Sequence, residues 1–286
     1  MPTVTTGETT TYYEIHGGGD ATPFMLAHGF AGSSQQYVPA ALPLAEDRPL
    51  VLWDARGHGR SSIPAELSAY SMPSYAADLA ALLDELRIER AYIGGQSLGG
   101  MITGQFAADY PERCAGIVLA DTSCGNGVDE GAAGDWERYV QLAIGTRSQN
   151  AAAYGLEEAM RMEFDWRREN DPKFRDGPYT LEDYVARAAH MTSAGYAGAA
   201  HAIVSRPDLR GRISAIRIPA LVMIGEWDGF YPCAVRDHAL IPDARLVIRK
   251  DCAHGFKWRT DVWLAELRSF LADADAGRGV AGTRKV

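Results

Sequence analysis

Residues 95–99 limit what this chain can fold into more than any other stretch. They read Gly-Gln-Ser-Leu-Gly and lie between a short apolar run at 91–93 and a helical segment at 101–110. A Gly-x-Ser-x-Gly sequence between a strand and a helix forms a sharp turn, which strains the serine backbone and holds its hydroxyl clear of the sheet. The N-terminus of the following helix presents backbone N–H groups where an oxyanion would form. The pattern therefore predicts Ser97 as a nucleophile.

The pentapeptide is weak support by itself, because 30 of the 286 residues are glycine. The rest of the chain strengthens it. Short apolar runs, typical of strands covered on both faces, alternate with helical segments, and they lie at 23–27, 50–53, 91–93, 115–120, 220–224 and 245–248. This alternation predicts a mostly parallel sheet with helices on both faces, and an edge hairpin at 3–16 brings the expected total to eight strands.

The alternation stops after Asp121, and the next 80 or so residues predict helices alone. These helices are expected at 135–144, 151–169 and 180–204. Their aromatic and methionine side chains are too numerous for one narrow stripe, which favours an inserted helical cap that covers Ser97 and bounds a substrate pocket. The predicted domains are a core at 1–122 and 207–272, a helical cap at 123–206 and a flexible tail at 273–286.

Three candidate catalytic side chains each follow a proposed strand. Ser97, Asp228 and His254 all fall at carboxyl ends of strands, where open α/β sheets place their ligands. A serine hydroxyl is a poor nucleophile until an imidazole takes its proton, and that imidazole needs a carboxylate to hold its tautomer. We therefore expect a Ser-His-Asp triad. Asp121, which ends the preceding strand, is the alternative acid.

Five short motifs follow one another along the chain: His28-Gly29-Phe30, Asp54 to Ser61, Gly95 to Gly99, Gly225 to Asp228, and His254-Gly255. With these motifs the chain resembles the α/β-hydrolase fold superfamily over about residues 10–271. It is most similar to the group containing carboxylesterases, 3-oxoadipate enol-lactonases and cofactor-free haloperoxidase-like perhydrolases. The resemblance implies the α/β-hydrolase fold, with an eight-stranded, mostly parallel sheet. The cap region carries no motif that matches.

The resemblance also implies roles for individual residues. Ser97 would attack, His254 would act as base and then acid, and Asp228 would orient His254. The backbone N–H groups of Phe30 and Leu98 would form the oxyanion hole. Two side chains are predicted to contact substrate, Phe30 and Trp227. In the loop at 54–61, we expect Asp54 and Arg56 to tie loops together and His58 to be structural.

The implied function is hydrolysis of a small to medium carboxylic ester through an acyl-enzyme, with no metal and no organic cofactor. Ser97 excludes the dehalogenases and epoxide hydrolases that use an aspartate nucleophile, and the loop at His28 lacks the Gly-Gly-Gly run of hormone-sensitive lipases. The alternative is an enol-lactone hydrolase on the same triad. A ligand receptor or signalling protein and a cofactor-free oxygenase also remain open on this scaffold.

Composition sets further limits. A net charge of −9 argues against a nucleic-acid or membrane-surface binder, for which a basic patch is expected. No apolar stretch reaches the length of a membrane span and the polar start does not resemble a secretory signal, so we expect a cytoplasmic protein. The four cysteines lie far apart, which favours reduced thiols over disulfides or a zinc site. The expected partner is a small-molecule ester or lactone, and a homodimer is left open.

Overall fold

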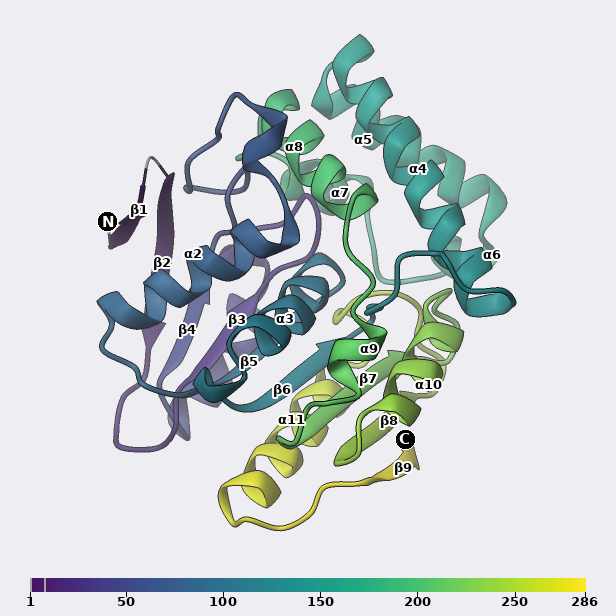
Figure 1. The fold of residues 1–286 in the computed structure, drawn as a ribbon. Coiled ribbons are helices and arrows are strands. Elements are labelled where there is room, and N and C mark those ends of the chain that lie inside the picture. The colour runs from purple at the N-terminus through teal and green to yellow at the C-terminus, as the bar shows by residue number, and fades with distance from the viewer. Residues whose placement is uncertain (1, 8) are drawn as a thin grey trace.

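The computed structural model describes residues 2–7 and 9–286, and its centre is a twisted sheet (Figure 1). The strands are β1 (Thr3–Thr6), β2 (Thr9–His16), β3 (Phe24–Ala27), β4 (Leu50–Trp53), β5 (Ala91–Gln96), β6 (Cys114–Ala120), β7 (Ala220–Gly225), β8 (Ala244–Arg249) and β9 (Gly282–Lys285). Their order across the sheet is β1-β2-β4-β3-β5-β6-β7-β8-β9. The pairs β1–β2 and β2–β4 are antiparallel, and every other neighbouring pair is parallel. The predicted architecture is confirmed, apart from the strand count.

The sheet has nine strands in the described residues, where the sequence predicts eight. The additional strand, β9, pairs in parallel with β8 and lies in the segment expected to be a flexible tail. All four of its residues are exposed, so no apolar pattern marks it in the sequence. Backbone hydrogen bonds hold it, including Val286 N–H to Ile248 O at 2.9 Å, and the buried side chain of Val280 anchors the turn before it.

Helices cover both faces of the sheet. Successive side chains of each central strand point to opposite faces and are apolar, so both faces must be shielded from water. Met25 and Val51 pack with α2 (Met72–Glu85) and α3 (Leu98–Asp109), and α10 (Tyr231–Leu240) lies in the same cluster. Phe24 and Leu50 pack on the other face against α11 (Thr260–Asp275). The remaining short helices of the core are α1 (Val38–Ala41), η1 (Ser34–Gln36), η2 (Leu42–Glu46), η3 (Leu67–Ala69) and η4 (Pro111–Arg113).

A helical insertion separates β6 from β7, as the sequence predicts. Its helices are α4 (Ala132–Tyr154), α5 (Leu156–Asn170), α6 (Pro172–Arg175), α7 (Leu181–Arg187), α8 (Ser193–Val204) and α9 (Arg210–Ile213). In Figure 1, α4 to α8 gather beyond one end of the sheet. The expected helix boundaries are partly wrong. α4 continues until Gly155, whose φ of 86° only glycine adopts readily, and the span 180–204 contains two helices because Thr192 caps a new one.

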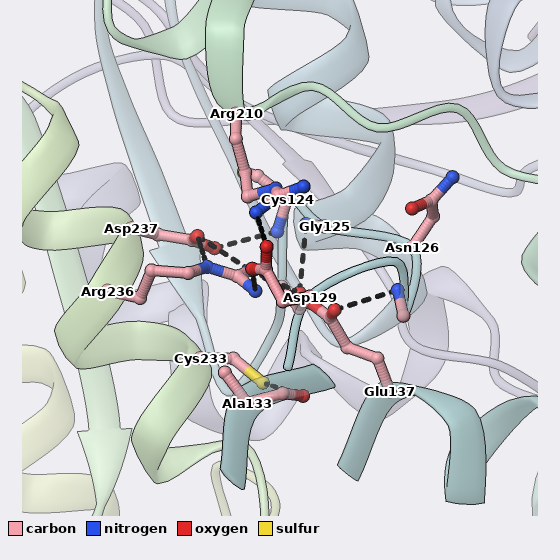
Figure 2. A network of polar contacts seen from close by, with 12 residues as sticks. Cys124, Gly125, Asn126, Asp129, Ala133, Glu137, Arg210, Cys233, Arg236 and Asp237 are labelled. Carbon is pink, nitrogen blue, oxygen red and sulfur yellow. Dashed lines mark hydrogen bonds and ion pairs between the residues drawn. The ribbon is translucent and has the colours of Figure 1, made fainter. Parts of the chain in front are cut away.

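A buried charge network fastens the start of α4 to α10 of the core (Figure 2). Arg236 of α10 pairs with Glu137 of α4 at 2.8 Å and with Asp129 at 3.0 Å. Only 1% of the Glu137 side chain is exposed, so this ion pair is shielded from solvent. The neighbouring Trp136 is held against the loop after β7, where a Cβ on Gly229 would lie 2.0 Å from its ring. The insertion therefore contacts the carboxyl ends of the strands.

Two further observations concern the chain as a whole. Across residues 2–7 and 9–286, no helix combines the length and the apolar character needed to cross a bilayer. All four cysteines are buried and free, and they are Cys114, Cys124, Cys233 and Cys252.

Candidate active site

Ser97 lies on the tight turn between β5 and α3. Its φ of 57° and ψ of −115° form a strained backbone conformation that non-glycine residues rarely adopt. The flanking glycines allow the turn, because a Cβ on Gly95 would lie 2.3 Å from the carbonyl carbon of Gly99. A Cβ on Gly99 would in turn lie 2.2 Å from the carbonyl oxygen of Ala27. The hydroxyl of Ser97 is thereby presented at the carboxyl end of the sheet.

His254 and Asp228 come together beside this turn. His254 Nδ1 lies 2.8 Å from Asp228 Oδ2, while the N–H of Phe230 donates to Asp228 Oδ1 at 2.9 Å. Both carboxylate oxygens are thus held, and only 1% of the Asp228 side chain is exposed. Within the described chain no hydrogen bond joins Ser97 to His254, so two of the three predicted residues are paired directly and the third lies at the same cavity.

Charges around His254 favour its protonated form. Burial alone would lower the pKa of His254, but the carboxylate of Asp228 outweighs burial and raises the pKa above its ordinary value of 6.5. Asp121 acts in the same direction, and the guanidinium of Arg167 in α5 acts in the opposite one. Burial likewise opposes ionisation of Asp228, yet the neighbouring His254 lowers the pKa of this carboxyl.

Asp121, the alternative acid, has a different partner. Both of its carboxylate oxygens lie 2.8 Å from Nη2 of Arg249, whose side chain is fully buried. It also accepts the backbone N–H groups of Gly225 and Gly255. Asp121 therefore ties together the two loops that carry Asp228 and His254, and the geometry favours Asp228 as the acid.

The two residues predicted to supply the N–H groups of an oxyanion hole, Phe30 and Leu98, belong to two segments beside Ser97. Leu98 is the first residue of α3, so its N–H has no carbonyl partner inside the helix. Phe30 follows β3, in the loop that faces Ser97 across Gly29. Neither N–H donates a hydrogen bond to the backbone of another described element. Both donors are thus available to a carbonyl oxygen at Ser97.

Two cavities meet at Ser97 and His254. The first has a volume of about 420 Å³, and its cap wall includes Trp136, Tyr139, Val140, Ile144 and Met160. The second has a volume of about 370 Å³, with Gln35, Gln96, Tyr179, His190 and Lys257 among its walls. The helical insertion therefore lies over Ser97.

The side chains predicted to contact substrate both reach these cavities. Phe30 lines both of them and packs on Tyr196 of α8 with ring centroids 4.4 Å apart. Trp227 lines the first cavity, and the Nζ of Lys173 lies 3.5 Å from the centre of its ring. The cap residues were not identifiable singly from the sequence, because no motif marks them.

The polar side chains of the loop at 54–61 hold neighbouring segments together, as we expect from the sequence. Asp54 accepts the N–H groups of Ser34 and Arg60 at 2.6 and 2.9 Å. Arg56 makes two hydrogen bonds to the buried carboxylate of Asp78, at 2.7 and 2.6 Å. Burial lowers the pKa of His58 to about 3, with the neighbouring His28 adding to the effect, so His58 stays neutral.

One contact at the site is absent from the sequence prediction. The side-chain nitrogen of Gln96 lies 3.0 Å from His254 Nε2, the ring nitrogen that faces away from Asp228. The position of Gln96 inside the pentapeptide, directly before Ser97, is the signal that could have drawn attention to it.

Known proteins share this architecture. The profile of the family described as alpha/beta hydrolase fold matches residues 22–259. The chain is 30% identical over 229 residues to 3-oxoadipate enol-lactonase 2 of Acinetobacter baylyi, which is 79% of each chain. The solved enol-lactonase from Burkholderia xenovorans LB400 is 26% identical with a TM-score of 0.78, covering 95% of this chain and 100% of that one. A proline iminopeptidase of Levilactobacillus brevis is 36% identical over 117 residues, 39% of each chain.

The parallel sheet, the strained serine turn and the helical insertion define an α/β-hydrolase-fold protein. Because the family profile spans most of the sequence, the chain belongs to the α/β hydrolase family. The relatives are named for different reactions, so membership establishes the scaffold and leaves the substrate to be inferred from the site.

Proposed function

We propose that the protein hydrolyses carboxylic esters through an acyl-enzyme formed on Ser97. The observation that carries the proposal is a strained serine at the junction of two cavities, beside an imidazole whose Nδ1 lies 2.8 Å from a buried carboxylate. A strained turn costs free energy and persists where function requires the exposed hydroxyl.

The proposed reaction uses the chain's own groups. His254 Nε2 accepts the proton of the Ser97 hydroxyl as Oγ attacks the substrate carbonyl carbon, and the carbonyl electrons move onto its oxygen. The N–H groups of Phe30 and Leu98 stabilise that oxyanion. The intermediate then collapses, the leaving oxygen takes the proton from Nε2, and water hydrolyses the acyl-enzyme by the same steps.

A lactone is the second candidate substrate, because a lactone is a cyclic ester that the same steps open. The names of the two enol-lactonases among the similar proteins favour it. Cavities of about 420 and 370 Å³ with aromatic walls suit small to medium substrates of either kind.

A substrate screen tests the proposal. We expect nitrophenyl esters of short acyl chains to be hydrolysed with sustained turnover. Their rate should be at least about tenfold higher than that of long-chain esters, because each methylene that does not fit the cavity lowers kcat/KM by about tenfold or more. Lactones of five- and six-membered rings are assayed in parallel. A single burst without turnover would instead indicate a ligand receptor, and a lack of reaction with every ester and lactone would overturn the proposal.

The raised pKa of His254 predicts the pH dependence of that activity. The proposed base must be neutral to accept a proton, so kcat/KM should fall about tenfold per pH unit below the pKa. Because Asp228 raises the pKa of His254, the midpoint should lie above pH 6.5. A pH series with a neutral short-chain ester measures it, and a midpoint clearly below 6.5 would contradict the assignment of His254.

A further inference from the structure

Gln96 has a place in the active site that the proposed steps do not yet use. It is the last residue of β5, directly before Ser97, and only 8% of it is exposed. Its side-chain nitrogen lies 3.0 Å from His254 Nε2. Nε2 is the atom that must accept the proton of Ser97 and later release it, so Gln96 contacts a reacting atom.

The tautomer of His254 fixes the direction of this hydrogen bond. In the neutral form of His254, which its role as base requires, the carboxylate of Asp228 accepts only, so the ring proton lies on Nδ1 and Nε2 carries a lone pair. Gln96 must therefore donate its amide N–H to Nε2. Its amide oxygen lies on the other side, where a Cβ on Gly29 would be 2.7 Å away, so the amide is confined between Gly29 and the imidazole.

Proton transfer removes the acceptor that Gln96 uses in the ligand-free enzyme. Once Nε2 has taken the proton of Ser97 it has no lone pair, and the amide N–H is left without that partner. At the same moment the leaving-group oxygen must come within hydrogen-bond reach of Nε2 to receive the proton, next to the amide nitrogen. A donor that gains its acceptor only along the reaction path accelerates the chemical step.

We infer that Gln96 is a catalytic residue that donates its amide N–H to the leaving-group oxygen as the tetrahedral intermediate collapses. The carbon–oxygen bond breaks, its electron pair goes to the leaving oxygen, and that oxygen takes the proton from Nε2 while Gln96 stabilises the charge. The inference rests on the proposed ester hydrolysis and adds to it a binding place for the alcohol part.

The cavities agree with this assignment. Gln96 lines the second cavity together with Ser97, His254 and Tyr179, and it is not among the residues that line the first. A leaving-group oxygen that accepts from Gln96 must lie on the side of the second cavity. The alcohol part therefore occupies the second cavity and the acyl part the first.

The test varies the leaving group at constant acyl group. Gln96→Met keeps the length of the side chain and removes the donor. With an ethyl ester, a poor leaving group, kcat/KM should fall about 10- to 100-fold, the range expected for a lost hydrogen bond to developing charge. With the nitrophenyl ester of the same acid, whose phenolate leaves without help, the change should stay within about threefold.

The matched control is Gln149→Met, the same substitution on an exposed position of α4, which should leave both rates unchanged. Gln96→Leu removes the amide with a different side-chain shape and should give the same selective loss. Equal losses with both esters in both Gln96 variants, or no loss with either, would overturn the role of Gln96 while leaving the proposed function intact. If wild-type protein hydrolyses neither ester, the proposed function itself fails.

Discussion

Replacing Ser97 with alanine should lower the rate of ester hydrolysis by at least about 10³-fold, because the acyl-enzyme cannot form without the Oγ atom. The backbone should tolerate the change, since alanine and serine face the same strain at a φ of 57°. Activity is measured with a short-chain nitrophenyl ester on purified protein, with circular dichroism and the thermal midpoint as checks of folding.

A control serine makes this result specific. Ser68 lies exposed in η3, away from both cavities, so Ser68→Ala should leave the rate within about twofold of wild type, as surface substitutions generally do. Retention of more than a few per cent of wild-type hydrolysis by folded Ser97→Ala protein would remove Ser97 from the mechanism.

The fold could be predicted because its signals are local and repeated. Each central strand is a short apolar run, and burial on both faces requires such a run, as the fully buried β3 and β4 show. β9 gives no such signal. Its residues are all exposed and charged or small, and its pairing with β8 depends on backbone hydrogen bonds that any sequence can make.

The candidate site was predictable to the extent that strand ends define it. Ser97, Asp228 and His254 each follow a strand, and the parallel sheet brings those ends to one edge. The position of Gln96 directly before Ser97 places it near the site, but its contact with His254 depends on a side-chain conformation that this position does not specify. Similarly, the cap residues around the first cavity come from helices whose mutual packing is not periodic in the sequence.

The two buried aspartates illustrate the difference between pattern and geometry. By strand position alone, Asp121 and Asp228 are equivalent, since each follows a strand of the sheet, and only the motif from Gly225 to Asp228 favours Asp228. The structure separates them by partner, because Asp228 contacts His254 whereas Asp121 pairs with Arg249. The same substitution should therefore impair mainly catalysis at Asp228 and mainly the stability of the fold at Asp121.

Asp228→Asn should lower kcat by about 10⁴-fold, since an asparagine amide can donate to Nδ1 and so leave the proton of His254 on Nε2, where it blocks acceptance of the Ser97 proton. Asp121→Asn should leave kcat within about threefold in folded protein. It should instead destabilise the fold by about 3–5 kcal/mol, because Arg249 is fully buried and would lose its counter-charge.

Steady-state kinetics and thermal unfolding of the two variants separate these effects. A loss of 3–5 kcal/mol corresponds to a thermal midpoint lower by about 10 °C in a chain of this size. The assay is therefore run well below the midpoint of the Asp121→Asn protein, so that lost activity cannot be mistaken for unfolding. The acid would have to be reassigned if folded Asp121→Asn protein lost more activity than Asp228→Asn. That outcome would place the catalytic acid at the end of β6, although Asp121 pairs with Arg249 and accepts the N–H groups of Gly225 and Gly255 in the structure.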